Sequence, residues 1–235
     1  MVLKAKRVHA NRLRADQTAG IPTTIKNPER VAHRRMELIE VATKLFLERG
    51  FHNTSIRDIV RACSFNIASL YMYVSSKEDI LYLVAQDLMN NIADELFDTP
   101  LDPKSAQGSL EHGFSSYCRI VDRLRRQVRL LYREVSFLPA ERRANVLRTV
   151  AGVVQFFEDI VQQGVDSGEF RSVNPRLTAL NILMMCHTIA LHTREMRELT
   201  SLNRYIESQL ALLFAGLIAK PDAKKNLSKL AAETR

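Results

Sequence analysis

Apolar residues recur along this chain mainly at helical spacing and seldom alternate with polar residues. The first clear stripe holds Ile39, Ala42 and Phe46, which share one face of a helix expected from about 29 to 49. Gly50 is the residue type that commonly follows such a helix. Because only 8 Gly and 7 Pro interrupt the whole sequence, the pattern predicts an all-α fold with long helices.

Two short apolar segments follow, with a break between them. Thr54 offers a hydroxyl cap to a first short helix, whose apolar side holds Ile56 and Ile59. Asn66 is the next candidate cap and opens a helix over 67–74. Two short helices that are joined by a tight turn and packed on a longer first helix form a helix-turn-helix, whose second helix enters the DNA major groove.

The rest of the pattern predicts further helices. One is expected over 77–97, and the Pro-containing segment 98–108 is expected to connect two domains. Pro139 fits the first turn of a long helix that ends near Gly164 or Gly168. The other predicted helices cover about 105–122, 124–136 and 175–196, and a last stripe runs from Leu202 to Leu217.

Composition narrows the class of protein. The chain has 235 residues, of which 46% are hydrophobic, enough for a sizeable core. Charged residues interrupt every apolar stretch well short of the ~20 residues that a membrane helix needs, so we expect no membrane partner. The basic start lacks an apolar core, which argues against a signal peptide. Three widely spaced cysteines favour a reducing cytoplasmic location without disulfides.

The net charge of +8 is unevenly distributed. Residues 1–35 contain nine Lys or Arg and two acidic residues, which favours a polyanionic partner. A solvated leader without a partner is an equally open interpretation. Residues 119–148 contain nine Arg and no Lys, and guanidinium groups suit phosphates and carboxylates better than ammonium groups do.

The segment 54–81 carries a recognisable order of residues. It resembles the tetracycline-repressor (TetR) family of bacterial regulators over roughly residues 30–82, through Thr54, Ile59, Ala62, Phe65, Asn66, Leu70, Tyr71, Met72, Tyr73, Val74, Lys77 and Leu81. The resemblance implies an N-terminal three-helix DNA-binding domain, followed by a larger helical ligand-binding and dimerisation domain. We accordingly expect a flexible basic arm over 1–28, the DNA-binding domain over 29–76, the second domain over 77–219 and a polar tail over 220–235.

The helix-turn-helix departs from the family pattern at three places. Ser64 stands where the family usually has Gly, Tyr73 and Val74 replace His-Phe, and Ile67 replaces a frequent Lys. A serine at a position that needs positive φ would cost on the order of 1 kcal/mol. The expected groove-facing residues are then Asn66, Ala68, Ser69 and Tyr71.

These groups bond poorly to bases, so we expect reading through thymine methyl groups and DNA shape. The predicted phosphate contacts are Thr54, Tyr71, Tyr73 and Lys77. Whether Arg35, with Arg30 and Arg34, adds phosphate or minor-groove contacts stays open. The alternative is that the two tyrosines are ordinary core aromatics and that Lys77 is solvated.

The second half offers a dimer interface and a ligand site. The helix over 175–197 is apolar nearly all round, which predicts a four-helix homodimer interface with the last helix. The resemblance implies an effector pocket, for which we select Arg129, Arg133, Phe137, Phe156, Met184 and His187. Arginines beside apolar residues favour an acyl-CoA thioester or another apolar effector. The alternative is plain core packing with solvated arginines.

No enzyme constellation is present. The sequence lacks a Gly-rich phosphate loop, a His-Glu-x-x-His motif and a Cys-x-x-Cys pair, so no metal or catalytic cofactor is expected. The favoured function is a ligand-responsive regulator, a repressor by resemblance, which binds a palindromic double-stranded DNA operator as a dimer. The alternatives are a sequence-independent architectural protein that coats DNA through the basic arm and an assembly protein without a ligand.

Overall fold

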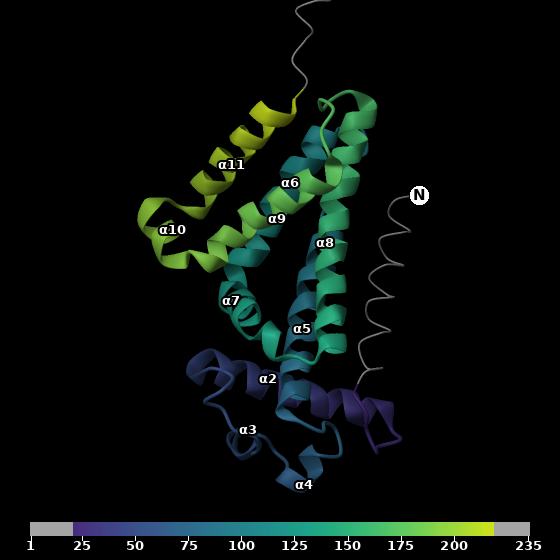
Figure 1. Ribbon diagram of the computed structural model, residues 1–235, viewed down its shortest axis with the longest axis vertical. Helices are drawn as coiled ribbons and strands as arrows, with labels where there is room; N and C mark the ends of the chain where they lie inside the picture. Colours follow the sequence, from purple (N-terminus) through teal and green to yellow (C-terminus); the bar gives the residue numbers. More distant parts are fainter. Residues whose placement is uncertain (1–20, 219–235) are drawn as a thin grey trace, which may run out of the picture.

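The computed structural model describes residues 21–218, in which a small three-helix unit lies at one end of a larger helical bundle (Figure 1). The small unit contains α2 (Pro28–Arg49), α3 (Ile56–Ala62) and α4 (Ile67–Leu70). The predicted all-α class is confirmed for the described part of the chain, where strand-like pairing is limited to one bridge between Phe170 and Ile218. Residues 1–20 and 219–235, which hold most of the predicted arm and tail, lie outside it.

Helix α2 begins and ends where the sequence predicts. The Asn27 side chain accepts a hydrogen bond from the amide of Arg30, Pro28 occupies the first turn, and Gly50 ends the helix with φ 85°. This positive φ is a conformation that glycine adopts without steric cost. Of the arm predicted over 1–28, the structure describes only the part from Ile21 onward, and Ile21 itself is buried in the core.

The two short helices differ from prediction at their ends. Ser55, and not Thr54, caps α3, and it forms a capping box with Asp58. Helix α4 stops at Leu70 although the pattern predicts 67–74. The amides of Met72 and Tyr73 bond to carbonyls three residues back, at Ser69 and Leu70, and this spacing tightens the chain out of α-helical geometry.

The larger bundle is built on α5 (Lys77–Phe97), which has the bounds that the sequence predicts. The helices that follow are α6 (Ala106–Arg123), α7 (Arg125–Glu134), the 3-10 turn η1 (Val135–Phe137), α8 (Ala140–Ser167), α9 (Pro175–Leu191), α10 (Thr193–Leu199) and α11 (Leu202–Leu217). The long helix α8 packs against α5, α6 and α9, so it forms the spine of the bundle (Figure 1). None of the helices described here is long and apolar enough to cross a membrane.

Two glycines explain how α8 ends. Gly164 lies inside α8, and Phe170 packs so closely against it that any side chain at this position would collide with the Phe170 ring. Gly168 ends the helix in the left-handed conformation, with φ 78°. Of the two predicted stops, the second is therefore the one used.

The helix predicted over 175–196 is broken at His192. The hydroxyl of Thr193 donates to the carbonyls of Ile189 and Ala190, at 3.2 and 2.9 Å. Such local side-chain bonds compete with the regular helix ladder. The chain therefore turns into α10 before it returns as α11.

Candidate functional site

Helix α4 exposes an apolar face at the end of the molecule (Figure 1). Ile67, Tyr71 and Met72 are 42%, 51% and 40% exposed, and Ala68 is also exposed. On the opposite side, Leu70, Tyr73 and Val74 are buried. Apolar side chains exposed next to one another on so short a segment form a candidate contact surface for a partner.

The turn before α4 is held by hydrogen bonds to α2. The amide of Ser64 donates to Glu37 Oε1 at 2.5 Å, and Arg34 Nη1 donates to the Ser64 hydroxyl at 2.6 Å. Burial alone would raise the pKa of Glu37, but the bonds from Ser64 and Arg34 outweigh it and lower that pKa. No described residue other than glycine has a positive φ, so Ser64 carries none of the strain considered from the sequence.

Three of the predicted DNA contacts are buried instead. Thr54 is fully buried and its hydroxyl donates to the Gly50 carbonyl at 2.8 Å. Tyr73 is only 3% exposed and packs against Phe65. Arg35 is 4% exposed. Their placement corrects the expectation that these three side chains face phosphates. Thr54 bonds to the end of α2, whereas Arg35 and Tyr73 hold the segments that flank α4.

Lys77 is also engaged inside the protein. Its Nζ donates to the carbonyls of Phe51 and Thr54, at 2.9 and 3.1 Å, and lies 4.3 Å from the centre of the Phe51 ring. The ammonium therefore fixes the start of α5 beside the loop before α3. This geometry corrects the prediction that Lys77 extends into solvent and contacts a DNA phosphate.

The other four predicted residues fit a DNA-facing role. Asn66 is exposed while its side chain caps α4 by accepting from the Ser69 amide at 2.9 Å. Ala68 and Tyr71 are exposed and Ser69 is half-buried. The structure therefore brings these four together on α4 and its two capping positions.

Sequence reasoning missed four exposed residues beside them. Ile67 and Met72 extend the apolar face of α4. Arg57 and Arg61 lie on the exposed side of α3, and the Arg61 side chain is 79% exposed. Arg57 and Arg61 are four residues apart and therefore share a helix face, which is the signal that could have identified them as a cationic surface.

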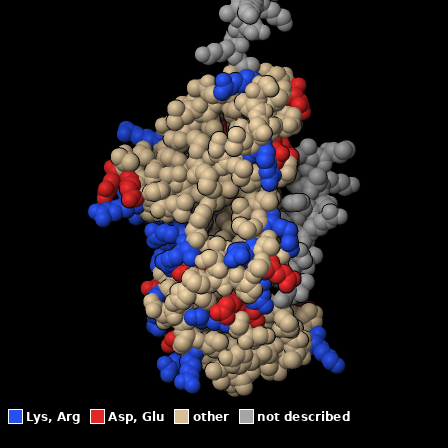
Figure 2. Space-filling model, in the orientation of Figure 1, with Lys and Arg blue, Asp and Glu red and all other residues tan. Residues whose placement is uncertain are grey.

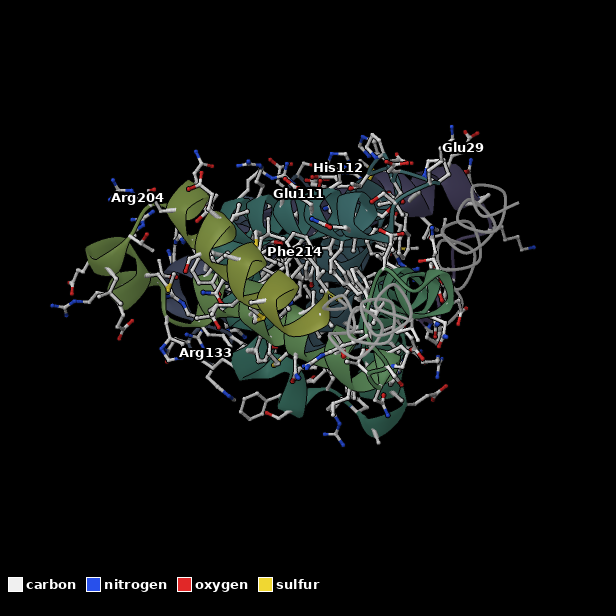
Figure 3. All side chains as sticks on the ribbon, turned by 90° about the horizontal axis from the view of Figure 1, so that it is seen from above. Glu29, Glu111, His112, Arg133, Arg204 and Phe214 are labelled. Carbon is white, nitrogen blue, oxygen red and sulfur yellow. The ribbon has the colours of Figure 1, made fainter. Side chains whose placement is uncertain are left out.

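The six predicted effector residues do not line one pocket in this structure. Arg129 is exposed, and Arg133 projects from the edge of the bundle and pairs with Glu134 (Figure 3). Met184 is 46% exposed, whereas Phe156 is buried against Phe97. The prediction of a common wall is corrected, because helix packing sends these side chains in different directions.

Phe137 and His187 occupy two further environments. The ring of Phe137 stacks on Phe51 and meets His52 edge-on, with ring centroids 4.3 Å apart in the second pair. It therefore contacts the small three-helix unit. His187 lies in the bundle, where its Nε2 is 2.6 Å from the Tyr117 hydroxyl and its Nδ1 is 2.6 Å from the Tyr132 hydroxyl.

The buried His187 is neutral. Burial lowers its pKa to about 4. A neutral imidazole donates from one nitrogen and accepts at the other, so one of the two tyrosines donates to it and the other accepts. Burial raises the pKa of Tyr117 and of Tyr132, so both remain hydroxyl groups. The three groups link the exposed Tyr132 to the interior of the bundle.

Comparison with known proteins matches both parts of the chain to one family. Residues 38–83 match the family described as bacterial regulatory proteins, tetR family. Residues 103–191 match the family described as tetracyclin repressor-like, C-terminal domain. Together these segments contain the helix-turn-helix and most of the larger bundle.

Two individual proteins that are similar to this chain are also transcriptional regulators. The chain is 29% identical to the HTH-type transcriptional regulator HbdR of Aromatoleum sp. (strain CIB), over 83% of this chain and 85% of HbdR. It is 26% identical to the HTH-type transcriptional repressor KstR2 of Rhodococcus jostii (strain RHA1), over 59% of this chain and 69% of KstR2.

A solved structure supports the fold. The crystal structure of AibR in complex with isovaleryl coenzyme A and operator DNA superposes with a TM-score of 0.64 at 22% identity, over 77% of this chain and 98% of AibR. The matched families and these relatives are transcriptional regulators and not enzymes. The chain therefore belongs to the TetR family and is a transcriptional regulator with an N-terminal helix-turn-helix.

Proposed function

We propose that this regulator is a cytoplasmic repressor that binds a palindromic operator as a homodimer and is released by an acyl-CoA-type effector. The observation that carries the proposal is the apolar face of α4, where Ile67, Tyr71 and Met72 are exposed although hydrophobic. Burying that face in a major groove removes it from water, and the relatives named above support the same role.

The composition of α4 indicates how the operator is read. Ile67, Ala68 and Met72 can contact thymine methyl groups, while Asn66 and Tyr71 add a few polar contacts. The exposed Arg57 and Arg61 on α3 supply cations for phosphates beside the reading helix. Specificity then depends on methyl contacts and DNA shape more than on paired base bonds.

A second apolar surface supports a homodimer. On α9, Leu177, Leu180 and Met184 are 58%, 41% and 46% exposed, and Leu212 on α11 is 63% exposed. Figure 2 shows a broad area with few charged residues over these two helices. Two copies of this surface, related by a two-fold axis, cover each other in a four-helix interface, and the second copy supplies the second reading helix that an operator needs.

The effector class is supported by the surface of α7. Arg126, Arg129 and Arg133 are exposed along this helix, and guanidinium groups bind phosphate oxygens in paired hydrogen bonds. The exposed Tyr132 lies between two of them in sequence and leads through His187 toward the bundle interior. We place the nucleotide part of a thioester on the arginines and its acyl chain in the bundle. The isovaleryl coenzyme A bound to AibR supports the class.

One contact within the bundle and one between the units can carry the effector signal to DNA. Asp79, which is 2% exposed in the first turn of α5, forms an ion pair with Arg142 of α8. Phe137 packs on Phe51 and His52 of the small unit. A ligand that favours another arrangement of α7 and α8 shifts the population away from the spacing that fits successive major grooves.

Retention of a promoter fragment tests DNA reading. The protein should keep its own upstream fragment in a gel-shift assay with excess random duplex, and equal loss to both DNAs would support an architectural protein instead. Isothermal titration then compares acyl-CoAs of several chain lengths with free fatty acids. We expect at least one acyl-CoA to bind and to release the DNA. If no acyl-CoA binds, this effector class is eliminated, while the proposed DNA binding is unaffected.

A further inference from the structure

Three side chains form a continuous series of hydrogen bonds across the bundle. The Tyr117 hydroxyl of α6 lies 2.6 Å from His187 Nε2, and His187 Nδ1 of α9 lies 2.6 Å from the Tyr132 hydroxyl of α7. Tyr117 is 2% exposed and His187 is 6% exposed, whereas Tyr132 is 44% exposed. The series therefore runs from the interior of the bundle to its surface, and its direction depends on where the protons lie.

The buried end of the series fixes those protons. Among the described residues, the Tyr117 hydroxyl has the imidazole as its one hydrogen-bond partner. If Nε2 carried a proton, it would donate to Tyr117, and the hydroxyl hydrogen of Tyr117 would be buried without an acceptor, which is unfavourable. Tyr117 therefore donates to Nε2. Because the buried imidazole is neutral, its one N–H proton lies on Nδ1.

This arrangement leaves a donor at the surface. Nδ1–H donates to the oxygen of Tyr132, so the hydroxyl hydrogen of Tyr132 is not used within the series. In the described part of the chain, Tyr132 has no hydrogen-bond partner besides His187. The donors all point the same way, and hydrogen bonds in such a chain polarise and strengthen one another. The Tyr132 hydroxyl can therefore donate to an acceptor that comes from outside the protein.

The surroundings of this donor match the two parts of the proposed effector. Arg129, three residues before Tyr132, shares its face of α7 and is exposed. At the inner end of the series, the Tyr117 ring packs on Phe157, which is buried in the core. An acyl-CoA has its anionic nucleotide on one side of the thioester carbonyl and its apolar chain on the other. Tyr132 lies between a cationic surface and an apolar interior in the same order.

We propose that the Tyr132 hydroxyl donates a hydrogen bond to the thioester carbonyl oxygen of the effector, and that Tyr117 and His187 orient this donor. The inference rests on the proposed effector class and extends it. A carbonyl oxygen can accept this bond and a methylene group cannot. Tyr132 therefore distinguishes a thioester from an otherwise equal ligand that lacks the carbonyl.

Matched ligands and matched variants test the carbonyl contact. Each acyl-CoA of the chain-length series is paired with its thioether analogue, such as octanoyl-CoA with S-octyl-CoA, in which a methylene group replaces the carbonyl. Tyr132→Phe removes the hydroxyl and keeps the ring. Tyr82→Phe is the control, because it removes a buried hydroxyl of α5 that accepts from Asn145 instead. Isothermal titration gives the affinities of the three proteins.

The wild type and the control should bind the thioester about tenfold more tightly than the thioether, as expected for one well-placed hydrogen bond. Tyr132→Phe should bind the two ligands equally, with its loss of affinity confined to the thioester. A preference that persists in Tyr132→Phe, or a wild type without any preference, would overturn the inference and leave the effector class standing. If no thioester binds, the effector class and this inference are overturned together.

The direction of the hydrogen bonds has a test of its own, which needs no ligand and no change at Tyr132. Long-range proton–nitrogen correlation NMR on protein with labelled histidine identifies the ring nitrogen that carries the proton, and His187→Gln assigns the signals. We expect a neutral His187 ring with its proton on Nδ1. A proton on Nε2 would mean that Tyr132 donates to the imidazole and has no hydrogen left for a ligand, which would contradict the proposal.

Discussion

Tyr71 and Tyr73 are two residues apart and have opposite surroundings. Tyr71 is half-exposed on the outer face of α4, while Tyr73 is buried against Phe65. Two residues correspond to about half a helical turn, so one of the pair must face inward as long as the chain stays coiled. Their roles in the protein differ for that reason alone.

Replacing each tyrosine should separate DNA contact from stability. Tyr71→Ala should lower operator affinity roughly tenfold with little change in the free energy of unfolding, since it removes an exposed contact. Tyr73→Ala should lower the free energy of unfolding by about 3 kcal/mol, as buried aromatic truncations do. Gel-shift titration and urea denaturation measure the two quantities. If Tyr73→Ala is as stable as the wild type but does not bind DNA, Tyr73 contacts DNA directly.

His187 gives the stability a dependence on pH. Its pKa is about 4 in the folded protein and near 6.5 when unfolded. Between these values the unfolded chain binds more protons, so stability falls as pH falls from about 6.5 toward 4.

The contribution can be isolated with a variant that does not titrate. Between pH 7.5 and pH 5, the wild type should lose about 2 kcal/mol more unfolding free energy than His187→Gln does. Urea denaturation at the two pH values measures this difference. Parallel losses in both proteins would show that His187 is not held neutral by burial.

At the scale of elements, capping residues and glycines predict most helix ends. Asn27 with Pro28, Ser76 and Asn174 with Pro175 begin helices as their residue types indicate, and α5 has the predicted bounds. These signals act within a few residues, so one sequence is enough to recognise them.

The sequence-based predictions are wrong where contacts between distant residues, or competing local hydrogen bonds, determine burial and helix ends. Arg35 is a cation on α2 whose burial depends on carbonyls of Ile21 and Tyr73, and local sequence does not report such partners. The break between α9 and α10 and the short α4 likewise depend on side-chain and three-residue bonds that compete with the helix ladder. The scattered effector residues show the same limit, since periodicity identifies apolar faces without saying which faces meet.

The outward face of α9 offers a test of the dimer. Leu177→Glu combined with Met184→Glu should convert the protein to a monomer, because two like charges per protomer meet at the proposed two-fold interface. Light scattering at micromolar concentration measures the mass. Leu199→Glu is a matched control, since Leu199 is 79% exposed on α10 outside the proposed interface. A dimer that persists in the double variant would place the interface elsewhere.

In the whole molecule, the small unit is joined to the bundle mainly through α2, which packs on α5 and α7. Phe137 is the aromatic side chain of η1 that touches the small unit, and it does so at Phe51 and His52. Within the bundle, the buried Asp79 at the start of α5 pairs with Arg142 of α8. Because α5 and α7 both pack on α2, a shift of these helices is expected to change the position of α4.

Phe137→Ala should weaken coupling without removing either binding event. Operator affinity and effector affinity should each stay within about threefold, while the effector concentration that releases DNA rises roughly fivefold or more. Titration calorimetry and fluorescence anisotropy give the three values. Leu147→Ala, at an exposed site on α8, is the control and should release DNA normally. If the Phe137 variant releases DNA at the same effector concentration as the wild type, the coupling contact is not in η1.

In the proposed complex, two copies of the chain present two α4 helices to one operator. Selection of bound sequences from a pool of random duplexes, followed by sequencing, tests this arrangement most directly. We expect enrichment of an inverted repeat whose half-sites lie on one face of the duplex, about one helical turn apart or a multiple of it. Recovery of a pool with no enriched sequence, or of a single half-site without its repeat, would contradict it.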